Sequence, residues 1–253
     1  MKRKFVLLAA IMYFCGLHAQ DFNSTSIFRS WGFIGDSLCS GEMECYAEGN
    51  PEVQYVDLYE YSWGQQLCRL SGSEGYNFSH GGQTARGWLD EWEGERGWGW
   101  ASRHPKQAYI LALGVNDYTR AMRGDSGFSL EEYAVDMAEI VRRIRSVSPD
   151  SYIFVLTRPR EEAEGNAYDS WNDVLRNLPA QFTRLWVIDL YKNAPVYDAS
   201  FRQQYYLNGH LSPAGYLYTA HLLMAEIDRI VRSEPSAFKE VALAGTPWKG
   251  SSW

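Results

Sequence analysis

The chain has 253 residues and a formal net charge of −7, and these values exclude several classes of protein. After the first 19 residues, no stretch gathers Lys and Arg into the basic clusters that nucleic-acid binding requires. The length suits one α/β domain with a substantial core. We therefore expect a single catalytic or binding domain without nucleic-acid partners.

Residues 1–19 are expected to form an export signal. Three basic residues at positions 2–4 precede an apolar run over residues 5–17, which is too short for a transmembrane helix. The small side chain of Ala19 predicts cleavage before Gln20, which would bring the formal charge to −10. An uncleaved anchor is the alternative. We expect a periplasmic or secreted protein that leaves the membrane after cleavage.

Export bears on the three cysteines that follow the signal, Cys39, Cys45 and Cys68. An oxidising compartment permits disulfides, and an odd number of cysteines allows one bridge at most. We expect Cys39 to pair with Cys45, with a reactive leftover thiol as the alternative. No pair has the spacing or the His partners of a zinc site, so no metal is expected.

Short apolar runs predict the strands of a buried sheet. Near-continuous apolar character suits strands that are covered on both faces, as in a parallel sheet. The run at residues 76–79 is weaker than the others. The predicted strands, in chain order, are residues 28–34, 76–79, 109–113, 152–156 and 185–190.

Helical patterns alternate with these runs. Ser129 and Glu132 form a capping box that precedes apolar residues at helical spacing. A second helix is predicted to begin at Ser212 and Pro213, a cap residue followed by proline in the first turn. The alternation predicts an α/β fold with a mainly parallel sheet of about five strands. In such sheets ligands bind beyond the carboxyl ends of the strands.

Two candidate catalytic segments follow the first two predicted strands. Ser37 lies in the turn at residues 34–38, where a strand end can present a hydroxyl that a nearby base makes nucleophilic. Gly82 lies in the glycine pair of residues 77–84, and a glycine lets a backbone N–H approach a developing oxyanion. Taken singly, each segment is equally consistent with an ordinary loop.

Two further segments supply an amide and an imidazole. Asn116 follows the strand at residues 109–113 and can direct its side-chain N–H to the same point. His210 lies two residues before the helix start at Ser212, and an imidazole titrates near neutral pH. The alternatives are a turn-forming asparagine and a surface histidine at a helix entrance.

In this order, the four segments resemble the signature blocks of the SGNH/GDSL hydrolase (esterase/lipase) family, over a span of residues 28–230. The resemblance implies a three-layer α/β/α sandwich of the flavodoxin-like SGNH hydrolase type. It implies that Ser37 is the nucleophile and His210 its general base. It also implies an oxyanion hole formed by the N–H groups of Ser37 and Gly82 and by the side chain of Asn116.

One position departs from the family pattern. The family carries an aspartate three residues before the histidine, where this chain has Leu207. Loss of such an orienting carboxylate can cost about 10⁴ in rate. We favour a Ser–His dyad in which a backbone carbonyl accepts the Nδ1–H of His210. The alternatives are a substitute polar side chain, with Asn208 nearest and Asp189 or Asp198 further away, and an impaired enzyme.

The predicted function is that of an exported serine esterase that removes acyl groups from carbohydrate. Acetyl is the acyl group expected, and neither a cofactor nor a metal is expected. Aromatic rings suit the C–H faces of sugars, although large aromatics also pack cores. The alternatives are a catalytically weak carbohydrate-binding protein on the same fold and a sugar acyltransferase. The tryptophans that follow the glycine pair suggested carbohydrate, namely Trp88, Trp92, Trp98 and Trp100.

The domain boundaries follow from these assignments. Residues 20–233 are expected to form the hydrolase domain, and residues 234–253 a C-terminal tail that either wraps the domain or remains loose. The charged segment at residues 158–173 either forms a rim over the site or is a solvated loop. The sequence leaves the oligomeric state open.

Overall fold

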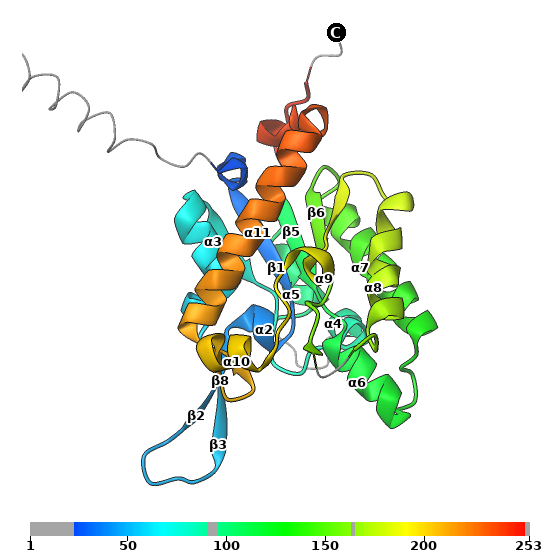
Figure 1. The fold of residues 1–253 in the computed structure, drawn as a ribbon. Helices are drawn as coiled ribbons and strands as arrows, with labels where there is room; N and C mark the ends of the chain where they lie inside the picture. The colour runs from blue at the N-terminus through cyan, green and yellow to red at the C-terminus, as the bar shows by residue number, and fades with distance from the viewer. Residues whose placement is uncertain (1–22, 91–95, 163–164, 251–253) are drawn as a thin grey trace, which may run out of the picture.

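A parallel five-stranded sheet forms the centre of the computed structural model, which describes residues 23–90, 96–162 and 165–250 (Figure 1). The strand order is β4-β1-β5-β6-β7, and each neighbouring pair is parallel. The predicted fold class is confirmed, and the weakest predicted strand is β4 at the sheet edge. The strands are β1 (Ser30–Gly35), β4 (Glu74–Asn77), β5 (Ala108–Ala112), β6 (Tyr152–Leu156) and β7 (Leu185–Ile188).

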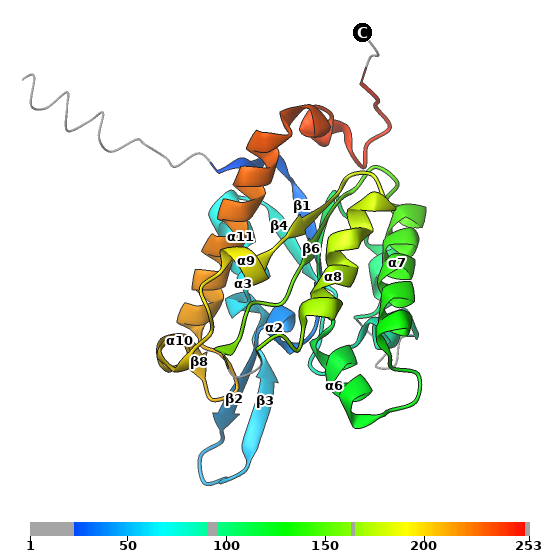
Figure 2. The ribbon, with the colours of Figure 1, turned by 45° about the vertical axis from the view of Figure 1, so that its right-hand side comes forward.

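Helices cover both faces of the sheet and complete three layers (Figure 2). One layer contains α3 (Trp63–Ser71) and α11 (Pro213–Ser233). The other layer contains α4 (Ala85–Asp90), α5 (Trp98–Arg103), α7 (Leu130–Val147) and α8 (Asp169–Asn177). Successive residues of a strand point to opposite faces of the sheet. Phe33 therefore packs with the residues of α3 and α11, and Ile34 packs with those of α4 and α7.

Both predicted helix starts are present. The Ser129 hydroxyl accepts the Glu132 N–H at 3.2 Å and caps α7, and the Ser212 hydroxyl accepts the Gly215 N–H at 3.2 Å and caps α11. Short helices lie near the strand ends or between longer elements. They are η1 (Ser24–Ile27), α2 (Ser37–Ser40), η2 (Tyr59–Tyr61), α6 (Val115–Arg123), η4 (Leu178–Ala180), α9 (Leu190–Asn193) and α10 (Ala199–Tyr205).

The described part of the C-terminal tail packs on the domain. It contains η5 (Pro235–Phe238) and η6 (Val241–Leu243), and the Phe238 ring stacks on Trp186 with 4.7 Å between centroids. Of the two alternatives, residues 234–250 therefore wrap the domain. The predicted export signal lies outside the described residues. Within the described ranges, no helix has the length and apolar character to cross a membrane.

Two small hairpins stand outside the central sheet. An antiparallel pair, β2 (Glu42–Tyr46) and β3 (Val53–Asp57), projects beyond the carboxyl ends of the strands (Figure 1). The second pair, β8 (Tyr206–Leu207) and β9 (His210–Leu211), turns back at residues 208–209. β2 and β9 lie in contact. Neither hairpin was predicted from the sequence.

The expected disulfide is absent from the described residues. Cys39, Cys45 and Cys68 are all free thiols, so the predicted Cys39–Cys45 bridge is wrong. Cys39 is buried at the end of β1, where it packs beside Gly35, whereas β2 carries Cys45 out onto the projecting hairpin. The two cysteines lie on different elements, Cys39 on α2 and Cys45 on β2.

Candidate active site

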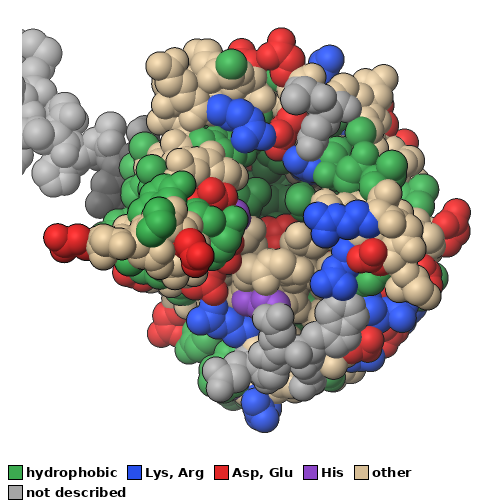
Figure 3. All heavy atoms as spheres, turned by 90° about the horizontal axis from the view of Figure 1, so that it is seen from below, with side chains coloured by type: hydrophobic (Ala, Val, Ile, Leu, Met, Phe, Trp, Pro, Cys, Tyr) green, Lys and Arg blue, Asp and Glu red, His purple; other side chains and the backbone are tan. Residues whose placement is uncertain are grey.

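The four candidate residues line one cavity of about 430 Å³ at the carboxyl ends of the strands. Ser37, Gly82 and Asn116 follow β1, β4 and β5, which are neighbours in the sheet. His210 reaches the same cavity from β9. In Figure 3, hydrophobic side chains line the depth of this hollow and basic side chains stand along its rim.

Ser37 begins the one-turn helix α2 directly after β1. The Asp36 carboxylate caps this helix by accepting the Leu38 N–H at 3.1 Å, and burial raises the pKa of Asp36 to about 6. A side chain at Gly35 would collide with Cys39, so glycine permits the close approach of strand and helix. These contacts fix the backbone that presents Ser37 to the cavity.

Gly82 and Asn116, the two predicted oxyanion donors besides the Ser37 N–H, line the same cavity as Ser37. Gly82 has φ of +71°, which favours glycine, and a Cβ there would meet open space. The Asn116 Nδ2 donates to the Gln83 carbonyl oxygen at 3.0 Å, which fixes the amide beside the glycine turn. An amide nitrogen carries two hydrogens, so this bond uses one donor and leaves the second for a ligand.

The His210 imidazole lies between two carboxylates from β2. Its Nδ1 lies 2.8 Å from Glu44 Oε1, and its Nε2 lies 3.2 Å from Glu42 Oε1. All three side chains are largely buried. The partner of His210 Nδ1 is thus the Glu44 carboxylate. The prediction that a backbone carbonyl accepts the Nδ1–H is wrong.

The geometry of the two hairpins explains how Glu44 reaches the imidazole. Glu42 and Glu44 alternate along β2 and so share a face, on which Tyr55 pairs with Glu44 from β3. The Tyr55 ring meets the His210 ring edge-on at 5.9 Å. A Cβ at Gly209 would lie 2.2 Å from Glu44 Oε1, so any other residue before His210 would require the Glu44 carboxylate to move.

The partner of Nδ1 is none of the three residues named above as substitutes for the family aspartate. Asn208, at φ of +59°, forms the turn and donates from Nδ2 to the backbone oxygen of Glu44 at 3.4 Å. Asp189 pairs with Arg176 at 2.9 Å, and Asp198 caps α10. The only local sign of Glu44 is a pair of acidic residues at alternate positions, 42 and 44, shortly after Ser37.

Glu42 occupies the space between the imidazole and the glycine turn. A Cβ at Gly81 would collide with Glu42 Oε2, while Glu42 Oε1 contacts His210 Nε2. Burial is the main cause that raises the pKa of Glu42 above its ordinary value, and the His210 charge opposes the rise. In this arrangement the Glu42 carboxylate holds the nitrogen that would accept the Ser37 proton.

The sequence profile of GDSL-like lipases and acylhydrolases matches residues 33–217. The chain belongs to this family. It is therefore an ester-hydrolysing enzyme with the three-layer fold that the resemblance implied. A comparison with curated proteins finds no match.

Solved structures share the fold of this GDSL-like hydrolase at low sequence identity. A family two carbohydrate esterase from Clostridium thermocellum in complex with cellohexaose has a TM-score of 0.59 and 17% identity, over 81% of this chain and 65% of that chain. A Cellvibrio japonicus enzyme of the same esterase family has a TM-score of 0.57 and 14% identity, over 81% and 62%. A G-D-S-L family protein from Desulfitobacterium hafniense has a TM-score of 0.54 and 17% identity, over 78% and 98%.

Of the four tryptophans that indicate carbohydrate, the three that the structure describes do not line the cavity of this GDSL-like hydrolase. Trp88 is fully buried and donates from Nε1 to the Phe78 carbonyl oxygen at 3.1 Å. Trp98 packs on Trp88, and Trp100 packs on His104 at the surface. Trp92 lies outside the described residues. The packing alternative therefore holds for Trp88, and the described tryptophans of this group form no part of the site.

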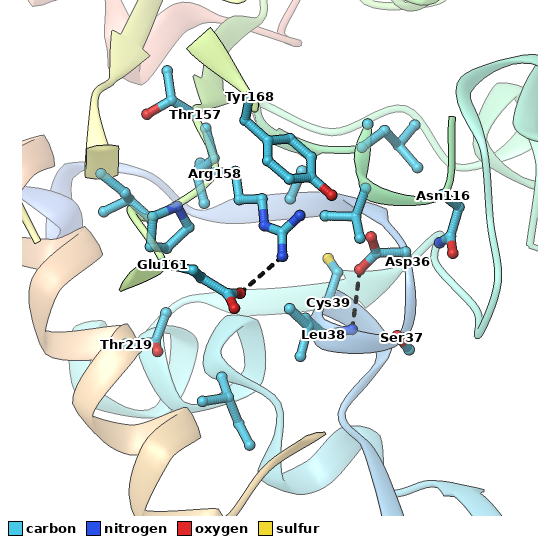
Figure 4. Close-up of a pocket in the computed structure, with 18 of the residues that line it drawn as sticks. Asp36, Ser37, Leu38, Cys39, Asn116, Thr157, Arg158, Glu161, Tyr168 and Thr219 are labelled. Atoms are coloured by element: carbon cyan, nitrogen blue, oxygen red, sulfur yellow. Dashed lines mark hydrogen bonds and ion pairs between the residues drawn. The ribbon is translucent and has the colours of Figure 1, made fainter. Parts of the chain in front are cut away.

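A charged cluster lines the part of the cavity that lies away from Ser37 (Figure 4). Arg158 pairs with Glu161 at 2.8 Å, and Arg202 pairs with the other oxygen of Glu161. The Arg158 guanidinium also lies 3.8 Å from the centre of the Tyr168 ring. Arg158, Glu161 and Tyr168 belong to the charged segment at residues 158–173 and are part of the cavity wall.

Among the residues described, no group of three His, Cys, Asp or Glu side chains fits a metal ion.

Proposed function

We propose that this enzyme hydrolyses acyl esters carried on carbohydrate through a Ser37–His210–Glu44 triad. The observation that carries the proposal is the shared cavity, in which Ser37 and His210 lie with Gly82 and Asn116, together with the 2.8 Å contact from His210 Nδ1 to Glu44. Hydrolysis of esters follows from the family; the residue roles and the substrate are the proposal.

The proposed reaction passes through an acyl-enzyme. His210 Nε2 accepts the Ser37 proton as the hydroxyl oxygen attacks the ester carbonyl, and the alcohol leaves with that proton. The N–H groups of Ser37 and Gly82 and the Asn116 amide hold the oxyanion. A water molecule then attacks the acyl-enzyme and gives a proton to His210, which passes that proton to the Ser37 oxygen as the acid is released. Glu44 stabilises the imidazolium, and Glu42 must leave Nε2 before the first step.

Two observations support carbohydrate as the alcohol part. Two structurally similar enzymes are named as carbohydrate esterases, one of them in complex with cellohexaose. In this chain, Tyr46 and Tyr55 lie on the β2–β3 face that carries Glu44, and their side chains are 60% and 58% exposed. Exposed rings beside the proposed base suit the apolar face of a sugar.

Hydrolysis of p-nitrophenyl acetate tests the residue roles. We expect the wild type to release p-nitrophenol and Ser37→Ala and His210→Ala to lose at least 10³ in turnover number. A fluorophosphonate should label the wild type and not the Ser37→Ala variant. Undiminished hydrolysis by Ser37→Ala would remove the proposed mechanism.

Glycan substrates separate the rival functions. The esterase should release acetate from acetylated cello-oligosaccharides into water. A binding protein would retain the oligosaccharide without releasing acetate. A transferase would instead move the acetyl group to an added sugar acceptor, which mass spectrometry of the products would reveal.

A further inference from the structure

The Glu42 carboxylate borders the reacting atoms of the proposed mechanism. It lines the same cavity as Ser37, and its Oε1 lies 3.2 Å from His210 Nε2, the nitrogen that would transfer the proton. The Glu42 side chain is 14% exposed, so it is not sealed in the core. A substrate atom that reaches Nε2 therefore comes within reach of the Glu42 carboxylate.

Glu42 differs in its partners from the two carboxyl groups that share its face of the hairpin. Asp57, which lies opposite Glu42 on β3, pairs with Arg96 at 2.9 Å. Glu44 has His210 Nδ1 at 2.8 Å. Among the described residues, the Glu42 carboxylate has no hydrogen-bonding partner besides His210 Nε2. Glu42 thus depends for its hydrogen bond on the nitrogen that the reaction requires.

The main chain of Glu42 is fixed, so its carboxylate leaves Nε2 by rotation of the side chain. The Tyr216 hydroxyl donates to the Glu42 backbone oxygen at 2.6 Å, and the residue belongs to the β2–β3 ladder. A Cβ at Gly81 would collide with Oε2, so the carboxylate also packs closely on the glycine turn. A carboxylate that leaves its only partner needs another donor in exchange. Water or a hydroxyl group of the substrate can supply that donor.

The mechanism brings the alcohol part of the ester to this place. The leaving oxygen takes its proton from His210 Nε2 and must therefore lie within hydrogen-bond reach of that nitrogen. Glu42 Oε1 contacts the same nitrogen. A hydroxyl on the carbon next to the esterified carbon lies close to the leaving oxygen, whatever the rest of the alcohol is. Such a hydroxyl can donate to Glu42 while the leaving oxygen meets Nε2.

We propose that Glu42 selects monoesters of vicinal diols, because a free hydroxyl next to the ester donates to its carboxylate, which then releases His210 Nε2 to Ser37. The hydroxyl keeps its proton, and the acyl transfer itself is unchanged. The inference rests on the proposed function and specifies its substrate. In a glycan, this class comprises acyl groups on ring hydroxyls that have a free neighbour. It leaves out acyl groups on the exocyclic CH₂OH of a hexose, because the next carbon carries the ring oxygen.

Two esters that differ in one donor test this role. In trans-2-hydroxycyclohexyl acetate and trans-2-fluorocyclohexyl acetate the substituents are of similar size, and only the hydroxyl can donate. We expect kcat/KM of the wild type to be at least about tenfold higher for the hydroxy ester, as is typical for a hydrogen bond to a charged group. In Glu42→Met, which keeps the length of the side chain and loses the acceptor, the ratio should fall to about one.

The matched control is Glu48→Met, at an exposed position in the turn of the same hairpin. This variant should keep the wild-type ratio. Equal kcat/KM for the two esters in the wild type, or an unchanged ratio in Glu42→Met, would overturn the proposal. If hydrolysis of p-nitrophenyl acetate still depends on Ser37 in that case, the proposed function stands and only the selection by Glu42 fails.

A binding measurement decides the role of Glu42 without reference to catalysis. In the Ser37→Ala variant, we expect the hydroxy ester to bind at least about fivefold more tightly than the fluoro ester in an NMR titration. Adding Glu42→Met should abolish that difference. If the double variant does not fold, Glu42→Gln, which removes the charge, should narrow the difference instead. Equal affinities in Ser37→Ala would refute the contact between Glu42 and the hydroxyl.

Discussion

At the scale of single residues, Glu44 resolves the departure at Leu207. The family aspartate three residues before the histidine is missing, yet a carboxylate lies 2.8 Å from His210 Nδ1. A carboxylate there holds the imidazole in the productive tautomer and stabilises its protonated form. The Leu207 side chain is 43% exposed, and Glu44 already occupies the position beside Nδ1.

This replacement makes Glu44 the first residue to test. Glu44→Gln should lower the turnover number for p-nitrophenyl acetate by about 10²–10⁴ because the imidazolium loses its counter-charge. Leu207→Asp should leave the rate within about twofold. Glu52→Gln, in the exposed hairpin turn, is the control. A Glu44→Gln variant with wild-type kinetics would restore the dyad.

Some residues of the candidate site could be predicted from the sequence, and others could not. The turns at Ser37 and Gly82 and the strand end at Asn116 are local patterns, so their meeting in one cavity could be expected from a parallel sheet. Glu44 could not be found this way. It contacts His210, which is distant in the chain, and it belongs to no distinctive local pattern.

At the scale of elements, the sheet and its long helices were easier to predict than the hairpins. Apart from β4, the strands of the sheet are largely apolar runs, and Ser129 and Ser212 mark the starts of α7 and α11. The β2–β3 hairpin has exposed tyrosines and alternating acids, and β8 and β9 have two residues each. Their pairing depends on packing against each other, which periodicity does not reveal.

The turn between β8 and β9 provides an element-scale prediction. In Gly209→Ala the new methyl group would collide with Glu44 Oε1, so the carboxylate must move away from the imidazole. We expect a drop of about 10² in turnover number with little change in melting temperature. A variant that loses activity only because it unfolds would show a lowered melting temperature instead.

At the scale of the whole molecule, buried carboxyl groups make stability depend on pH. Burial raises the pKa of Asp117 from 3.8 to about 7, although each of its oxygens accepts the Ala85 N–H, at 2.9 and 3.2 Å. The folded state therefore holds this proton more tightly than the unfolded state does. Between about pH 4 and 7 this group makes the free energy of unfolding fall as the pH rises.

Urea unfolding at several pH values would measure the effect. The shift of Asp117 corresponds to an upper limit of about 4 kcal/mol lost between pH 4 and 7. Asp117→Asn should flatten this dependence, whereas the exposed Asp125→Asn should not alter it. An equally steep fall in Asp117→Asn would assign the pH dependence to other groups, including Asp36.

The position of Glu44 on β2 also affects how catalytic residues are predicted from the sequences of this family. The proposed nucleophile and the proposed acid both lie within residues 37–44, and the histidine lies far along the chain. Under this proposal, Leu207 in place of the family aspartate does not imply a loss of activity. Chains that lack that aspartate merit inspection for an acidic strand just downstream of the serine before they are dismissed as inactive.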